Sequence, residues 1–285
     1  MKTFRTAPML ASMATVLAVS LGVIGGASGP QTVAAPVPSA GACAAKPTVV
    51  LVHGAWAGTS SWSGEIERLQ RAGYTTRAFA NPLRGLTGDA ANLAAFLKTI
   101  DGPIVLVGHS YGGSVITNAA AGNPDVEQLV YVDAAAPAVG ETTGQLSGKT
   151  SALGGQPSTL YDQVPYAGAP AGDADLYLKQ PVFLDSFGPD LPKPVATVLW
   201  AGQRPAAKSA FTTPSKAAAW KTIPSWYVIG TADKIITPES QQAMAKRANA
   251  KVLQVRGGSH LTLISHPGPV TDQILAAAGA ACPSK

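Results

Sequence analysis

Charged side chains are scarce in this sequence. Lys, Arg, Asp and Glu make up 13% of its 285 residues, whereas 46% are hydrophobic. This composition excludes a disordered chain away from the ends, because disordered proteins are poor in apolar residues and rich in charge. A chain of this length can bury one sizeable core, and many α/β folds of similar length form a single domain.

Runs of Lys or Arg are also missing, although the formal net charge is +5. Nucleic-acid-binding proteins gather basic residues on one face or in one segment, so we expect no nucleic acid among the partners. The sequence has no cluster of Cys and His at ligand spacing and no glycine-rich phosphate loop. We therefore expect no metal and no organic cofactor.

The N-terminal residues differ from the rest of the chain. Lys2 and Arg5 precede an apolar run from Met9 to Ile24, and small residues and prolines follow it. This is the order of regions in a secretory signal peptide; serine, threonine and glycine interrupt the run, which disfavours a membrane anchor. We expect residues 1–42 to be a signal peptide and linker, and the protein to be secreted, with no membrane contact beyond export.

The sequence contains only two cysteines, Cys43 and Cys282. They lie near the two ends of the expected exported chain, where an oxidising compartment and an even count favour a disulfide bond. Lipid attachment at Cys43 is a competing interpretation that the preceding residues fit poorly. Two free, buried thiols are the remaining alternative.

Short apolar strands alternate with helical segments from residue 46 onward. The valine-rich runs 47–54 and 103–108 are typical of strands buried on both faces of a parallel sheet. The alternation predicts an α/β fold with a doubly wound, mostly parallel sheet. Strands are expected at 47–54, 75–80, 103–108, 128–134, 225–230 and 251–257. Helices are expected at about 60–72, 87–100, 111–122, 237–249 and 268–280.

Residues 135–223 break this alternation. They are rich in Gly, Pro, Ala and Thr and show no clear hydrophobic period. An unstructured loop of that length is unusual within a compact domain, so a functional insertion is expected. The predicted organisation is one α/β domain over 43–285, with a cap inserted at about 135–223 between the fourth and fifth strands.

The motif GHSYG at residues 108–112 follows one expected strand and opens the next expected helix. A G-x-S-x-G sequence at a strand–turn–helix junction forms a nucleophile elbow. Its glycines let strand and helix approach closely, and the serine hydroxyl projects from the sheet edge beside a helix N-terminus. Glycine and serine are common, but this position makes Ser110 the predicted nucleophile.

A serine hydroxyl requires a base, and the chain has four histidines. His260 follows the last strand through a Gly-Gly-Ser loop, which places it at the same sheet edge as the serine, so it is the predicted base. His109 is expected to point away from the nucleophile. His53 ends the first strand and His266 precedes Pro267 at a helix start, positions typical of packing or capping roles.

The base in turn requires a carboxylate that holds its tautomer. Asp233 follows the strand at 225–230 and lies between the serine and the histidine, matching the order Ser…Asp…His of elbow-containing folds. Asp133, at the end of the strand at 128–134, is the competitor, and a structural hydrogen-bonding role fits it equally well. Asp233 is the predicted acid.

Backbone N–H groups must stabilise the oxyanion that forms during acyl transfer. One is expected from Tyr111, directly after the nucleophile. The other is expected from the loop after the first strand, at Ala55, with Trp56 as the alternative. Gly54 lets that loop approach the serine without a side-chain clash.

Together these segments resemble the α/β-hydrolase superfamily, and within it the branch of plant methylesterases, hydroxynitrile lyases and bacterial carboxylesterases such as pyrethroid hydrolases. The resemblance spans about 47–280 and rests on VLVHGAW, VGHSYGG, YVDAAAP, IGTADKIITP and GSHLTLISHP. It implies an α/β-hydrolase fold and a serine carboxylesterase that cleaves a small-molecule ester through an acyl-enzyme.

Three positions bear on the chemistry within this resemblance. Hydroxynitrile lyases carry threonine where this chain has Gly54 and lysine where it has Leu261, and related dehalogenases and epoxide hydrolases use aspartate in place of Ser110. An amidase, lactonase or perhydrolase with the same triad, or a non-catalytic binding protein of the same fold, remain alternatives. Aromatic residues of the insertion are expected either to line an apolar pocket or to form the cap core: Tyr161, Tyr166, Phe183, Phe187, Trp200 and Trp220.

Overall fold

The computed structural model describes residues 46–281. The predicted signal peptide and linker at 1–42 lie outside these residues, and so do both members of the predicted disulfide, Cys43 and Cys282. Secretion and the disulfide therefore stay predictions.

Six parallel strands form the central sheet, in the order β2-β1-β3-β4-β8-β9. They are β1 (Thr48–Val52), β2 (Thr76–Phe79), β3 (Ile104–His109), β4 (Val126–Val132), β8 (Ser225–Gly230) and β9 (Lys251–Val255). Each lies where the sequence predicts a strand, and every residue of the inner strands β3 and β8 is buried. The predicted doubly wound α/β fold is confirmed. Apolar strands of this kind are stable in it because helices cover both faces of the sheet.

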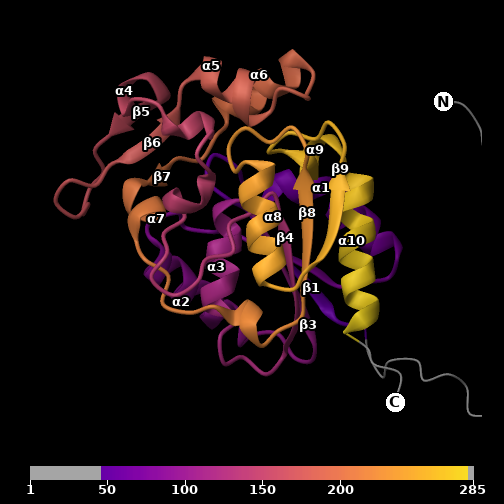
Figure 1. Cartoon of the computed structure of the whole chain (residues 1–285). Helices are drawn as coiled ribbons and strands as arrows, with labels where there is room; N and C mark the ends of the chain where they lie inside the picture. Colours follow the sequence, from indigo (N-terminus) through magenta and orange to yellow (C-terminus); the bar gives the residue numbers. More distant parts are fainter. Residues whose placement is uncertain (1–45, 282–285) are drawn as a thin grey trace, which may run out of the picture. The chain divides into compact units, whose positions relative to one another are not determined.

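Helices cover both faces of the sheet (Figure 1). They are α1 (Ser63–Arg71), α2 (Leu86–Leu97), α3 (Tyr111–Ala119), α8 (Pro238–Arg247) and α10 (Pro267–Ala280). Helices α1 and α10 contact each other on one face, and α2 contacts α3 on the other, where α8 also lies. No helix within residues 46–281 is long and apolar enough to cross a membrane.

The starts of α1 and α8 compare differently with the sequence. A short helical turn, η1 (Thr59–Trp62), leads directly into α1, so the helix expected at 60–72 is divided in two. At the start of α8, the hydroxyl of Thr237 accepts a hydrogen bond from the Ser240 N–H over 3.4 Å, and Pro238 follows as the first helical residue. Proline suits that position because the N–H it lacks would have no partner within the helix.

The segment between β4 and β8 is built of short elements. Three strands, β5 (Tyr161–Val164), β6 (Asp175–Leu178) and β7 (Ala206–Ala207), form a small antiparallel sheet. The helical elements are η2 (Gly144–Ser147), η3 (Ala152–Gly154), α4 (Pro157–Leu160), α5 (Gln180–Val182), η4 (Phe183–Phe187), α6 (Lys193–Ala201), α7 (Lys208–Thr212) and η5 (Ala219–Lys221). In Figure 1, α5 and α6 lie on the side toward which the arrow of β8 points. The division into domain and cap stays a prediction.

Candidate active site

Ser110 lies at a sharp turn between β3 and α3. Its φ of 54° and ψ of −124° fall in a region that non-glycine residues avoid, at a cost of about 1–3 kcal/mol. Both glycines of the motif are required by close backbone approach: a Cβ on Gly108 would lie 2.6 Å from the Gly112 carbonyl oxygen, and one on Gly112 would lie 2.5 Å from the Val52 carbonyl oxygen. The local sequence therefore forms the strained elbow that the motif predicts.

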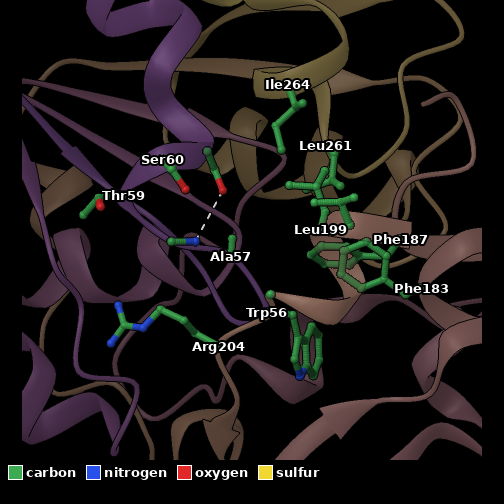
Figure 2. A pocket seen from close by; sticks show the side chains of 14 residues that line it. Trp56, Ala57, Thr59, Ser60, Phe183, Phe187, Leu199, Arg204, Leu261 and Ile264 are labelled. Carbon is green, nitrogen blue, oxygen red and sulfur yellow. Dashed lines mark hydrogen bonds between the residues drawn. The ribbon is translucent and has the colours of Figure 1, made fainter. Parts of the chain in front are cut away.

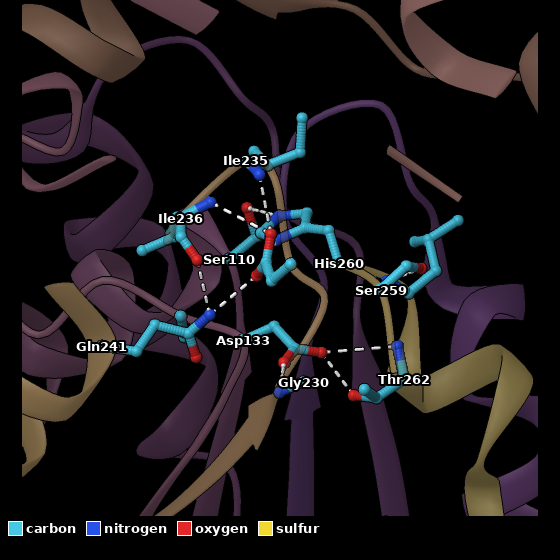
Figure 3. A network of polar contacts seen from close by, with 12 residues as sticks. Ser110, Asp133, Gly230, Ile235, Ile236, Gln241, Ser259, His260 and Thr262 are labelled. Carbon is cyan, nitrogen blue, oxygen red and sulfur yellow. Dashed lines mark hydrogen bonds and ion pairs between the residues drawn. The ribbon is translucent and has the colours of Figure 1, made fainter. Parts of the chain in front are cut away.

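The imidazole of His260 meets this serine. Nε2 of His260 lies 2.8 Å from Oγ of Ser110, a hydrogen-bond distance (Figure 3). His260 reaches the site from the loop between β9 and the short helix α9 (Thr262–Ser265). Ser110 is 5% exposed and His260 is fully buried, so both groups are shielded from bulk water.

Asp233 contacts the other side of the same imidazole. Its Oδ2 lies 2.8 Å from Nδ1 of His260. Its Oδ1 accepts hydrogen bonds from the N–H groups of Ile235 at 2.7 Å and Ile236 at 3.1 Å. The structure therefore brings the predicted nucleophile, base and acid into one chain of hydrogen bonds.

Gln241 is a member of this network that the sequence analysis missed. Its Nε2 donates to Oδ2 of Asp233 over 2.7 Å and to the Ile236 carbonyl oxygen over 2.7 Å. A glutamine in the first turn of the helix expected at 237–249 was the available signal. That signal is weak, because nothing in the sequence shows that this helix face turns toward Asp233.

The competing acid, Asp133, is held by other partners. Its Oδ1 accepts from the Gly230 N–H at 2.7 Å, and its Oδ2 accepts from the N–H of Thr262 at 3.3 Å and from the hydroxyl of the same threonine. Burial, together with the nearby charge of Asp233, raises the pKa of Asp133. Asp133 thus links the ends of β4 and β8 to the histidine loop and has no hydrogen bond to His260 (Figure 3).

His109 contacts His260 instead of the serine. Its Nε2 donates to the main-chain carbonyl of His260 over 2.8 Å, and the centres of the two rings are 5.0 Å apart. Burial lowers the pKa of His109 well below its usual value, so the ring is neutral near pH 7. The sequence predicted that the His109 side chain would point away from Ser110. It did not predict that this side chain would support the loop carrying His260.

The remaining two histidines have structural contacts. His53 donates from Nδ1 to the Gly54 carbonyl oxygen over 2.9 Å, and its Nε2 accepts from the Asn81 N–H over 3.1 Å, as a packing role predicts. His266 occupies the position before α10, but its side chain does not cap that helix. Its Nδ1 is hydrogen-bonded to the Ser265 hydroxyl over 2.8 Å, so the capping interpretation was wrong.

Two backbone N–H groups next to the serine are available for an oxyanion. The Trp56 N–H donates to the Arg204 carbonyl oxygen over 2.9 Å, which removes the alternative donor. Among the hydrogen bonds of residues 46–281, the Ala55 N–H has no acceptor, and Tyr111 begins α3, where an N–H has no intrahelical partner. A Cβ on Gly54 would lie 2.6 Å from the Cβ of Ser110, so this loop approaches the serine only because residue 54 is glycine.

A pocket of about 350 Å³ lies beside this site (Figure 2), and it is lined by Trp56, which follows Ala55 in the chain, and by Leu261, which follows His260. Phe187 belongs to both regions: it lines the pocket, and the centre of its ring lies 5.1 Å from that of His260. Apolar side chains form one part of the lining: Trp56, Phe183, Phe187, Val198, Leu199, Leu261 and Ile264. Thr59, Ser60, Ser61 and Arg204 form a polar part.

The aromatic residues of the insertion divide between pocket and packing. Phe183 and Phe187 line the pocket, and Tyr161 stacks on Trp56 with ring centres 5.9 Å apart. Trp200 and Trp220 donate to backbone carbonyls, at Leu178 over 2.9 Å and at Pro137 over 2.8 Å, and Tyr166 donates to Asp173 over 3.0 Å. Two of the six expected aromatics therefore line the pocket described here.

Residues 46–281 contain no group of three or more His, Cys, Asp or Glu side chains that could hold a metal ion. That no metal or organic cofactor takes part stays a prediction. The chemistry available in the described residues is that of a serine hydroxyl, an imidazole and a carboxylate in line, beside two free backbone N–H groups.

This fold and this site belong to a known class of protein: the chain is a member of the alpha/beta hydrolase family, whose model matches residues 49–273. It is 29% identical to the alpha/beta hydrolase nvfD of Aspergillus novofumigatus over 257 residues, which cover 83% of this chain and 98% of that protein. The fold is similar to that of polyneuridine aldehyde esterase, with a TM-score of 0.69 and 19% identity, covering 81% of this chain and 99% of the other. It is also similar to a pyrethroid hydrolase from Sphingobium faniae JZ-2, with a TM-score of 0.62 and 22% identity, covering 82% and 98%. The resemblance inferred from the sequence motifs is confirmed.

Proposed function

We propose that the protein is a serine carboxylesterase that uses Ser110 as nucleophile, His260 as general base and Asp233 as the orienting acid. The observation that carries this proposal is the pair of 2.8 Å contacts that join Ser110 to His260 and His260 to Asp233. This arrangement supplies both groups that a serine needs to act near neutral pH, a base and a carboxylate that stabilises the imidazolium.

The proposed reaction has two halves. The Oγ of Ser110 attacks the ester carbonyl carbon while its proton passes to Nε2 of His260, and the carbonyl oxygen becomes an oxyanion that accepts from the N–H groups of Ala55 and Tyr111. Collapse of this intermediate breaks the bond to the alcohol, which leaves with the proton from His260. Water then gives a proton to His260 and attacks the acyl-enzyme, which releases the acid and restores Ser110.

The surroundings of the serine favour ester hydrolysis over the lyase reaction of the same branch. Leu261 is buried and apolar where the lyases carry a lysine that would stabilise a cyanide leaving group. Two similar solved structures are named as an esterase and a pyrethroid hydrolase, and this supports hydrolysis as the reaction class. The apolar part of the pocket supports an ester with an apolar group of small or medium size. We further propose that the enzyme acts outside the cell. This proposal rests only on the signal-peptide pattern in the sequence of residues 1–42.

Labelling with a fluorophosphonate probe and release of 4-nitrophenol from acyl esters test this function together. The purified protein should be labelled at Ser110 and should hydrolyse the esters, and Ser110→Ala should do neither. Labelling without ester hydrolysis, but with hydrolysis of anilides or lactones, would point to an amidase or lactonase. A protein that is neither labelled nor active while folded would be a binding protein of the same fold.

A further inference from the structure

The polar part of the pocket contains one charged side chain. Of the fourteen lining residues, Arg204 alone is charged and none is acidic. Figure 2 shows its guanidinium on the side of Thr59, away from Phe187 and Leu199. The pocket therefore has an apolar end at Phe187, which contacts His260, and a cationic end on the side of Thr59.

Arg204 forms no ion pair within the described part of the chain. Among residues 46–281, no carboxylate lies within 4.0 Å of its guanidinium nitrogens. Two other arginines each form an ion pair, the exposed Arg84 with Asp175 and the half-buried Arg247 with Glu141. Because a guanidinium stays protonated at any pH an enzyme meets, Arg204 gives the pocket a permanent positive charge.

Contacts with the core fix the position of this arginine and leave most of its donors free. Nη1 of Arg204 donates to Nε2 of His53 over 2.9 Å. Burial, with a smaller contribution from the Arg204 charge, lowers the pKa of His53 to about 4, so His53 is a neutral acceptor near pH 7. A guanidinium carries five N–H donors, and this is the one hydrogen bond that the side chain makes within the described residues.

The same arginine is tied to the loop that carries the candidate oxyanion donor. Its carbonyl oxygen accepts the Trp56 N–H over 2.9 Å, and Trp56 directly follows Ala55. At the apolar end of the pocket, Leu261 directly follows His260 in the chain. A molecule lying along the pocket would thus have Arg204 at one end and the wall next to His260 at the other.

We propose that Arg204 is an anion-binding subsite, and that the preferred substrates are esters carrying a carboxylate separated from the scissile bond by an apolar segment. The planar carboxylate matches the fork of guanidinium donors, and charge-assisted hydrogen bonds of this kind are the strong ones. The apolar segment would lie against Phe183, Phe187 and Leu199. This inference rests on the proposed esterase function and defines its substrate class.

Paired ester series test the subsite. One series has neutral 4-nitrophenyl alkanoates of increasing chain length, and the other has the same chains ending in a carboxylate. The wild-type enzyme should have a higher kcat/KM for at least one carboxylate ester than for its neutral counterpart. Arg204→Gln should lower the ratio of carboxylate to neutral kcat/KM by about tenfold, mainly through KM, because a charge-assisted hydrogen bond is lost. Added salt should lower the same ratio in the wild type.

Two controls separate the subsite from general damage. Without Arg204, Nε2 of His53 still accepts from the Asn81 N–H over 3.1 Å, so Arg204→Gln should unfold near the wild-type temperature. Arg71→Gln removes an arginine whose side chain is 61% exposed and pairs with Glu67 on the surface of α1, and it should leave the ratio unchanged. A wild-type enzyme without preference for any carboxylate ester, or an Arg204→Gln variant with the wild-type ratio, would show that the subsite is wrong.

A binding measurement distinguishes failure of the subsite from failure of the proposed function. Calorimetric titration of Ser110→Ala with the methyl ester of a dicarboxylic acid needs no turnover. Binding that weakens in Ser110→Ala/Arg204→Gln supports the subsite even if the wild-type enzyme cleaves no ester, in which case the proposed function alone is wrong. Equal binding by both variants contradicts the subsite whatever the activity.

Discussion

The side-chain amide of Gln241 donates to Oδ2 of Asp233 over 2.7 Å, and this same oxygen faces Nδ1 of His260 at 2.8 Å. Gln241 is fully buried and is held by a second bond to the Ile236 carbonyl oxygen. The amide therefore fixes the carboxylate in the orientation that meets the imidazole. A neutral donor suits this place because it stabilises the ionised carboxylate without competing with His260 for charge.

Gln241→Met keeps a side chain of similar length and removes that donor. We expect kcat to fall roughly ten- to a hundredfold, because a small displacement of a catalytic group is costly, while KM changes little. Gln242→Met is the matched control, since Gln242 is the exposed neighbour in the same helix. Equal kcat values for the two variants in steady-state ester hydrolysis would show that Gln241 does not position Asp233.

The proposed triad predicts non-additive mutational effects. Ser110→Ala and His260→Ala should each lower kcat by about 10⁶, and the double variant should lose little more, because both residues act in one step. Steady-state rates with a 4-nitrophenyl ester measure all three. A double variant whose loss equals the product of the single losses would mean that the two residues do not act as a unit.

The two buried aspartates should differ in what they support. Asp233→Asn should lower kcat by about 10⁴, because the amide presents the wrong partner to the His260 tautomer. Asp133→Asn should retain most activity and instead lower the unfolding temperature, because its amide would meet the N–H of Thr262 with a second donor. Kinetics and thermal unfolding of both variants decide this. A larger kinetic loss from Asp133→Asn, at equal folded yield, would reverse the assignment of the acid.

Phe187 should control which acyl groups are accepted. Its ring is fully buried between the pocket, Phe183 and His260, with centres 4.8 Å and 5.1 Å from those two rings. Phe187→Leu should shift the ratio of kcat/KM values toward bulkier esters, and it removes less volume than alanine would, which limits the loss of stability. Trp200→Leu is the comparison, because Trp200 does not line the pocket. A fall in unfolding temperature with an unchanged ratio would identify Phe187 as core only.

Much of the site could be predicted because its signals are local in the sequence. The elbow, the loop with Asp233 and the loop with His260 each follow a strand, and the ends of parallel strands meet at one sheet edge. The contact of Arg204 with His53 joins residues 151 positions apart and depends on how the insertion folds back. The insertion has no hydrophobic period, so its short strands could not be placed from sequence. The same limit applies to the contact between Gln241 and Asp233, which depends on the rotation of α8.

Glu65 gives a prediction about stability against pH. It is fully buried in α1, neither carboxyl oxygen has a hydrogen-bond partner within residues 46–281, and burial raises its pKa to about 9. The folded state therefore holds a proton that the unfolded state releases near pH 4.5. Its contribution to stability is complete below pH 4.5 and is lost as the pH rises toward 9.

Glu65→Gln replaces this carboxyl with a neutral side chain of the same shape and should remove that dependence. Between pH 6 and 8.5, the free energy of unfolding of the wild type should fall with a slope of up to about 1.4 kcal/mol per pH unit relative to that of the variant. Urea unfolding at several pH values in this range measures the difference. Glu67→Gln is the matched control two residues along the same helix, because the side chain of Glu67 is 65% exposed and should leave the slope unchanged. Parallel curves for the wild type and Glu65→Gln would mean that Glu65 is ionised in the folded protein.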